Sequence, residues 1–126
     1  MRLLLDTHAL IFLLGEPERM AQAARDAIAD PANDVAFSAV NVWEIEIKAK
    51  TGKLVPPAED TLAAAQTLPL RELAVTADHA RAAGRLPLHH ADPFDRALIA
   101  QARVEGLTVV TRDGAFGLYD VALLPC

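Results

Sequence analysis

The chain has 126 residues, enough for one hydrophobic core, and we expect residues 1–126 to form a single domain. Although 52% of the residues are hydrophobic, no apolar stretch approaches the roughly 18 residues of a membrane span, so no membrane association is expected. The net charge of −5 argues against a broad basic surface for nucleic acid. The single cysteine, Cys126, excludes an internal disulfide, and because no signal-peptide pattern is present, we expect a cytoplasmic protein.

The chain opens with a run of leucines, residues 3–5, that leads directly into Asp6. A short apolar run halted by polar residues is typical of a buried central strand. Ligands of open α/β sheets bind outside the carboxyl ends of the strands, which would place Asp6 in a site, but the same acid is equally suited to cap the next helix. We predict that helix from Thr7 to Leu14, and an antiparallel partner from Glu18 to Ala29.

The middle of the chain alternates strands with helices. In order, we predict a strand, a long helix, a brief helix, an edge strand and a short helix at residues 34–38, 39–50, 60–66, 73–75 and 77–83. Ser38 is placed to cap the long helix, and Gly84 is placed to end the short one.

The last third of the chain repeats the opening pattern. Asp92 is a good N-cap for a helix that carries Asp95 in its first turn and ends at Gly106. A second apolar strand at residues 107–111 follows, and it also leads into an acid, Asp113. Strands that alternate with helices predict an α/β fold with a central parallel sheet and helices on both faces.

Parallel neighbours would bring Asp6 and Asp113 together at one sheet edge, close to Asp95. Ionised carboxylates at that density repel one another, so such a cluster requires cations. Hard oxygen ligands favour Mg²⁺ or Mn²⁺, which activate water and stabilise the leaving oxygen in phosphodiester cleavage. The long helix offers a fourth acid, Glu44 or Glu46, and helical periodicity alone does not choose between them.

Four segments of the chain resemble those of a known family. They are Leu4–Ile11, Ser38–Ile45, Asp92–Ala100 and Val110–Phe116. In this order they resemble the four signature blocks of PIN-domain ribonucleases and, more narrowly, of the VapC toxins of bacterial toxin–antitoxin pairs. The resemblance selects Glu44 over Glu46 and implies a PIN-like fold. It also implies a catalytic and metal-binding site made of Asp6, Glu44, Asp95 and Asp113.

The resemblance also implies a function. It points to an endoribonuclease that hydrolyses RNA phosphodiesters with Mg²⁺ or Mn²⁺, forms a homodimer and is held inactive by a cognate VapB-like antitoxin. We expect the antitoxin to cover an apolar patch on the first helix pair, residues 7–14 and 18–29, and to present a Lys or Arg to the four acids.

Other side chains near the predicted site have two interpretations each. The hydroxyls of Ser38 and Thr111 are suited to orienting water, but both also fit strand-end or cap positions. Asp92 fits a helix cap better than an outer ligand of the metal. The candidate RNA-phosphate contacts are three lysines and two arginines, although a solvated position is the default for each: Lys48, Lys50, Lys53, Arg96 and Arg112.

Two further expectations concern aromatic and imidazole rings. His8, His89 and His90 lack the paired helical spacing of a metal site, and we expect them on the rim of the site or in a loop. Trp43 is expected in the core rather than as a platform for base stacking.

Two other functions compete with the nuclease. A phosphatase of the haloacid-dehalogenase type also begins with a strand that ends in Asp, but its chemistry needs a second Asp two residues later, where this chain has His8. A non-catalytic interaction module, in which the acids only cap helices, is compatible with the sequence. A metal titration combined with a cleavage assay separates it from the nuclease.

Overall fold

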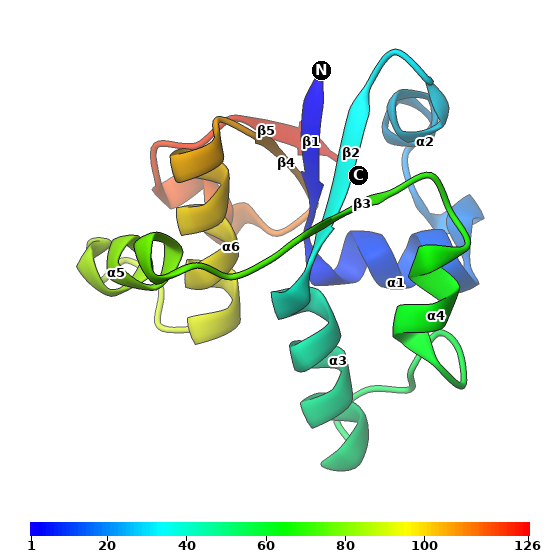
Figure 1. The fold of residues 1–126 in the computed structure, drawn as a ribbon, viewed down its shortest axis with the longest axis horizontal. Coiled ribbons are helices and arrows are strands. Elements are labelled where there is room, and N and C mark those ends of the chain that lie inside the picture. Colours follow the sequence, from blue (N-terminus) through cyan, green and yellow to red (C-terminus); the bar gives the residue numbers. More distant parts are fainter.

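The computed structural model describes all 126 residues, Met1–Cys126. Five strands form one parallel sheet in the order β3-β2-β1-β4-β5 (Figure 1). The strands are β1 (Arg2–Leu5), β2 (Asp34–Ser38), β3 (Arg71–Leu73), β4 (Thr108–Thr111) and β5 (Leu123–Pro125). The predicted α/β fold with a central parallel sheet is therefore confirmed.

Helices connect the strands and cover the sheet. The α-helices are α1 (Thr7–Gly15), α2 (Gln22–Ala29), α3 (Ala39–Lys50), α4 (Thr61–Gln66), α5 (Ala77–Arg85) and α6 (Pro93–Glu105). Two short 3-10 turns, η1 (Pro17–Arg19) and η2 (Gly114–Leu118), complete the structure. None of these helices combines the length and the apolar content that crossing a membrane requires.

The central strand β1 is buried on both faces of the sheet. Its Leu3 and Leu5 side chains belong to one core and its Leu4 side chain to the other, and all three are fully buried. The first core lies against α1, α2 and α4, and the second lies against α5 and α6 (Figure 1). Burial on both faces explains why this strand reads as a continuous apolar run and not as an alternating one.

The register of the sheet brings the predicted acids to one edge. Leu5 of β1 pairs with Val110 of β4, and the Asp6 amide extends this ladder by donating to the Val110 carbonyl at 3.1 Å. On the other side of β1, strand β2 ends at Ser38, where α3 begins. Because all the strands are parallel, α1 and α3 both start from this edge (Figure 1). The edge is therefore where the side chains of Asp6, α3 and the loop after β4 meet.

The predicted helix from Glu18 to Ala29 is wrong over residues 18–21. The backbone forms the turn η1 and then becomes extended at Met20 and Ala21, with ψ angles of 149° and 142°, before α2 begins at Gln22. Pro17 begins the turn, and Met20, only 3% exposed, is held in the first core. Burial of Met20 thus interrupts a segment whose helical spacing looked continuous.

Two further boundaries differ from the prediction. The edge strand lies two residues earlier than predicted, where Arg71 forms an ion pair with Asp34 at 3.2 Å and Leu73 is buried, whereas Val75 is 48% exposed. Helix α5 ends at Arg85, one residue after Gly84, so this glycine does not end the helix. Unlike Gly52 and Gly106, it does not adopt a positive φ.

Candidate active site

A polar cavity of about 180 Å³ opens at this sheet edge, and none of its lining residues is hydrophobic. We call this cavity the acidic pocket. It is lined by Asp6, Thr7, His8, Glu44, Lys48, His90, Asp92, Asp95 and Asp113. All four acids that the sequence suggested line this one cavity. They come from the ends of β1 and β4 and from α3 and α6.

Asp6 fills both of the roles between which the sequence did not choose. Its Oδ1 accepts a hydrogen bond from the Ala9 amide at 2.7 Å and so caps α1, while its Oδ2 accepts one from Thr111 Oγ1 at 2.5 Å. The side chain is almost completely buried, and this desolvation raises the pKa of Asp6 above its usual value. Thr111 therefore lies beside the site, and its hydroxyl donates to the Asp6 carboxylate.

The structure places Glu44, and not Glu46, in the pocket. Glu44 is 3% exposed and lines the cavity, whereas Glu46 lies on the exposed face of α3. Its Oε1 accepts a hydrogen bond from Thr7 Oγ1 at 2.6 Å, and its Oε2 forms an ion pair with Lys48 Nζ. Asn41 in turn donates to the Thr7 hydroxyl at 3.2 Å. Both oxygens of this carboxylate are therefore positioned by neighbours on α1 and α3.

Thr7 and Asn41 were missed at the level of sequence. Thr7 is only 4% exposed and Asn41 is fully buried. The available signal was the position of Thr7 directly after the strand-end acid, and a buried Thr there needs a hydrogen-bond partner. The partner belongs to another helix, so the pairing was not readable from spacing.

Asp95 lies in the outer part of the pocket beside a histidine. Its Oδ2 is 2.8 Å from His90 Nε2, and Asp92 caps α6 by accepting from the amides of Phe94 and Asp95 at 2.8 and 3.0 Å. Burial, with a smaller contribution from nearby carboxylates, raises the pKa of Asp95 to about 6, although the hydrogen bond with His90 opposes this shift. His90 is thus a direct partner of a pocket acid, which its prediction as a loop residue did not specify.

Asp113 is the most exposed of the four acids. Its Oδ1 accepts from the Ala115 amide at 2.9 Å and so caps the turn η2. One ligand atom from each of His90, Asp95 and Asp113 lies within 4.8 Å of the other two. This spacing would let the three side chains converge on a single ion.

A family model described as the PIN domain matches residues 3–122. The chain belongs to the PIN-domain family. Its backbone is similar to that of a chain of VapBC2 from Rickettsia felis bound to a promoter DNA fragment, with 16% identity, 99% and 98% of the two chains covered and a TM-score of 0.74. It is also similar to the sarcin-ricin-loop-cleaving toxin VapC20 of Mycobacterium tuberculosis, with 20% identity, 95% of this chain and 96% of that chain covered, and a TM-score of 0.67.

A third solved structure shares this fold. FitAcB from Neisseria gonorrhoeae has 24% identity over 97% of this PIN domain and 96% of that chain, with a TM-score of 0.65. Among curated proteins, no sequence matches this chain. The PIN-like fold that the four sequence blocks implied is therefore confirmed by both the family model and the solved structures.

The donor set of this PIN domain fits a divalent metal ion. It offers carboxylate oxygens from the four predicted acids, together with the imidazole of His90. Burial raises the pKa of Asp6 and of Asp95, which means that their ionised forms are costly until a positive charge approaches. Lys48 supplies only one positive charge, and its ion pair is with Glu44. Mg²⁺ and Mn²⁺ prefer such oxygen ligands.

Two of the predicted outer residues lie away from the pocket. Ser38 is fully buried and caps α3, and its hydroxyl donates to Gln101 Oε1 at 2.6 Å. Arg96 is 9% exposed, and its guanidinium donates to four backbone carbonyls, those of Pro87, His90, Ala83 and Leu86. Ser38 therefore takes the helix-cap position that was one of its two interpretations, whereas the expected phosphate contact of Arg96 is replaced by a role in fixing the loop before α6.

Arg112 also serves the fold. Its guanidinium donates to the carbonyls of Arg19 and Cys126 at 2.6 and 3.0 Å and lies over the Phe12 ring at 4.4 Å. It does not line the acidic pocket, so the expected phosphate contact is not supported by its position. Of the predicted cationic contacts, only Lys48 lines the acidic pocket.

The expectation that Trp43 is buried in the core is wrong. Its side chain is 59% exposed and lies edge-on against the Phe94 ring at 5.0 Å. Trp43 precedes Glu44 on α3, so turning Glu44 into the pocket rotates the indole by about 100° toward solvent. Burial of the acid thus determines the exposure of the aromatic ring.

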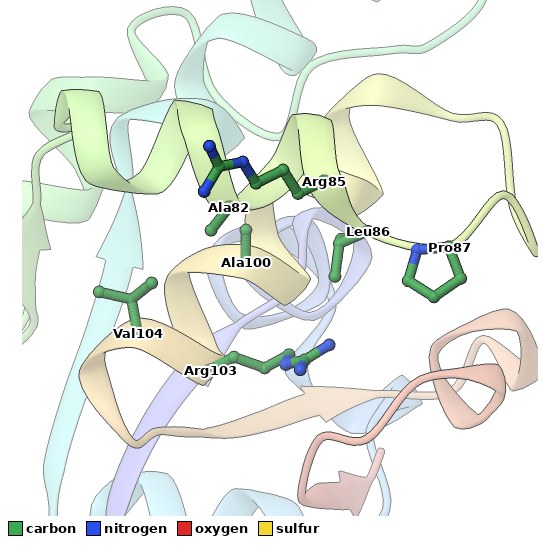
Figure 2. Close-up of a pocket in the computed structure, with 7 residues that line it drawn as sticks. All are labelled: Ala82, Arg85, Leu86, Pro87, Ala100, Arg103 and Val104. Carbon is green, nitrogen blue, oxygen red and sulfur yellow. The ribbon is translucent and has the colours of Figure 1, made fainter.

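A larger cavity of about 450 Å³ lies between α5 and α6 (Figure 2). Ala82 and Ala100 face each other where the two helices meet, and Arg85 and Arg103 extend across the opening in opposite directions. No acid lines this cavity, so it does not provide ligands for a metal ion.

Proposed function

We propose that this PIN domain is a Mg²⁺- or Mn²⁺-dependent endoribonuclease and the toxin of a toxin–antitoxin pair. The observation that carries the proposal is the convergence of four acids from separate parts of the chain on one polar cavity of about 180 Å³. A bound divalent ion would activate water and stabilise the leaving oxygen of a phosphodiester. One structural neighbour, VapC20, is a toxin that cleaves the sarcin-ricin loop, which supports RNA as the substrate class.

Within this proposal, the chain's own residues prepare the site. Asp6, Glu44, Asp95 and Asp113 would hold the metal, and the hydroxyls of Thr111 and Thr7 fix the orientation of the first two carboxylates. The ammonium of Lys48 donates to Glu44 Oε2 and so lies beside the negative charge of that carboxylate. His90 helps to position the third carboxylate, because its Nε2 lies 2.8 Å from Asp95 Oδ2.

Expressing the chain alone and mapping new RNA ends tests the proposal. The control is Asp6→Asn, which keeps an oxygen for the α1 cap but removes the negative charge. We expect new RNA ends with the native chain and none with the variant. Identical ends from both proteins, or none from either, would rule the nuclease out.

A non-catalytic module deserves the same test, because three of the acids do cap helices. Asp6, Asp92 and Asp113 accept hydrogen bonds at the starts of α1, α6 and η2. Glu44 caps nothing, however, and a glutamate that is 3% exposed is costly unless it serves a purpose beyond capping. Glu44 therefore favours the nuclease over the module.

We propose that a VapB-like antitoxin covers the first helix pair. An apolar cavity of about 280 Å³ lies there, lined by Leu13, Pro17, Arg25, Ile28, Ala29, Leu68, Pro69 and Leu70. Several structural neighbours belong to VapBC toxin–antitoxin systems, which supports a partner of this kind. An antitoxin Lys or Arg that reached the acidic pocket would compete with the metal for the same carboxylates.

A calorimetric titration separates competition from simple obstruction. We expect Mn²⁺ and the antitoxin to weaken each other's binding, and Asp6→Asn to reduce this mutual effect. Antitoxin affinity that is independent of both metal and Asp6→Asn would leave only steric blocking.

The predicted homodimer remains a proposal, and the exposed face of α3 and α4 is the surface we assign to it. Trp43, Ile47 and Leu62 are 59%, 40% and 37% exposed there. Trp43→Ser should lower the mass measured by sedimentation from dimer to monomer, whereas Leu118→Ser, at a comparable exposure of 56%, should not. An unchanged mass for Trp43→Ser would contradict this assignment.

A further inference from the structure

A second cavity, of about 220 Å³, adjoins the acidic pocket. The two cavities share Thr7, His8, Glu44 and Lys48 as a common wall. The second cavity contains none of the other pocket acids, and Lys53 lines it instead. A strand that entered the acidic pocket from this side would therefore pass from a cavity lined by two lysines into one lined mainly by acids.

The turn that ends α3 places Lys53 in this cavity. The Lys53 amide donates to the Lys48 carbonyl at 2.9 Å, and the Gly52 amide donates to the Ala49 carbonyl at 3.2 Å. With Gly52 at a φ of +74°, these two bonds form a Schellman motif. The motif brings the side chains at its two ends together, and those positions commonly carry an apolar pair. Here both are lysines.

The two lysines differ in how their charge is balanced. Lys48 forms an ion pair with Glu44, whereas the Lys53 side chain makes no ion pair and no hydrogen bond in the structure. The motif thus fixes the backbone of a lysine whose ammonium is unpaired and which lines the cavity beside the acidic pocket. Such a charge suits an anion, and the phosphate of a nucleic acid strand is the anion that the proposed reaction provides.

We propose that Lys53 binds the backbone phosphate next to the scissile phosphodiester of the RNA, with the adjoining cavity as the subsite for that nucleotide. This inference rests on the proposed nuclease function and names the side of the acidic pocket along which the strand runs. Lys53 is a binding residue that acts on the substrate and not on the metal. It secures a strand that the four acids alone would repel.

Salt dependence of RNA binding tests this subsite. Lys53→Gln and the control Lys50→Gln, also an exposed lysine but outside the cavity, are each combined with the non-cleaving Asp6→Asn change. The probe is a single-stranded RNA of about ten nucleotides. One lost phosphate contact lowers the slope of log Kd against log salt by about 0.7. We expect this decrease for Lys53→Gln, none for Lys50→Gln, and recovery in Lys53→Arg.

Two more measurements separate positioning from charge and the subsite from the function. Gly52→Ala strains the left-handed turn although a Cβ there meets no neighbour, so it should weaken RNA binding while keeping every charge. In the otherwise native enzyme, Lys53→Gln should raise KM about fivefold with little change in kcat.

The possible contrary results distinguish a failure of the subsite from a failure of the proposed function. Equal slopes for Lys53→Gln, Lys50→Gln and the parent would overturn the subsite while leaving the nuclease intact. Equal decreases for the two lysine variants would do the same, because they would show a general charge effect. Weaker antitoxin binding with an unchanged RNA slope would assign Lys53 to the protein partner. Cleavage by Asp6→Asn would refute the proposed function, and absence of RNA binding by the parent would refute both.

Discussion

The acidic pocket has two unlike halves. Its inner pair, Asp6 and Glu44, is 3% exposed at each residue and is held by threonine hydroxyls. Its outer pair, Asp95 and Asp113, is more accessible, and Asp95 is held by the imidazole of His90. In the outer pair, burial raises the pKa of Asp95 to about 6. The two halves therefore differ in accessibility and in the groups that position their acids, and the charge of Asp95 in the outer half changes near pH 6.

Breaking the inner half should have the largest effect. Glu44→Gln should reduce cleavage by about two to three orders of magnitude, because it removes a negative charge from the site. Glu46→Gln, two residues away on the exposed face of α3, should leave the rate nearly unchanged. Initial rates on one RNA substrate measure both variants. If Glu46→Gln were the inactive one, the arrangement of α3 described above would be wrong.

The support of the inner half can be weakened without touching an acid. Thr7→Val and Thr111→Val keep the side-chain shape but remove the donors to Glu44 and Asp6, and each should reduce metal affinity or activity by about tenfold to a hundredfold. Thr51→Val is the matched control, because its hydroxyl bonds only to carbonyls of its own helix. Mn²⁺ titration measures the affinity, and equal affinities for all three variants would contradict the positioning role.

The contribution of the outer half to metal binding should depend on pH. Because the pKa of Asp95 is raised to about 6, Mn²⁺ affinity should fall as the pH drops below about 6, where protons compete for this carboxylate. His90 opposes the shift, so His90→Gln should move the loss of affinity to higher pH. Calorimetric titrations between about pH 5 and pH 8 measure both curves. Superimposable curves for native protein and variant would contradict the coupling.

The smallest expected effect is on the stability of the metal-free protein. Protonation of Asp95 is favoured in the folded state, so its contribution to the free energy of unfolding is full below its unfolded pKa and is lost as the pH rises through about 6. The Tm of the metal-free protein should therefore fall slightly between pH 5 and pH 7, and Asp95→Asn should flatten this dependence. Addition of Mn²⁺ at pH 7 should raise the Tm. A Tm that rises with pH only in the native protein would contradict this sign.

Much of the fold was predictable because its signals are local. The run of leucines in β1 and the cap Asp92 of α6 each depend on neighbouring residues, and the structure has both elements as predicted. The start of α2 was not predictable, because burial of Met20 in a distant core ends the helical spacing there. The shift of β3 likewise depends on the ion pair between Arg71 and Asp34, which joins two strands.

The acids of the site were predictable for a similar reason, and their partners were not. Asp6 and Asp113 follow apolar strands, so topology alone brings them to one edge. The choice of Glu44 came from a family resemblance, and its burial in the structure agrees with that choice. Thr7 and His90 reach the pocket through contacts between elements that no spacing records. Arg96 was predicted to be a surface cation because the backbone carbonyls that it binds, those of Ala83 and Leu86, come from another part of the chain.

The central claim is that the acidic pocket cleaves RNA with a divalent metal ion that is not needed for the fold. Cleavage of a single-stranded RNA by the purified chain should be measured with Mg²⁺ or Mn²⁺ and again in excess chelator, with circular dichroism recorded on the same samples. We predict that activity disappears in chelator and returns with the metal, while the spectrum stays unchanged. Full activity in chelator would contradict it.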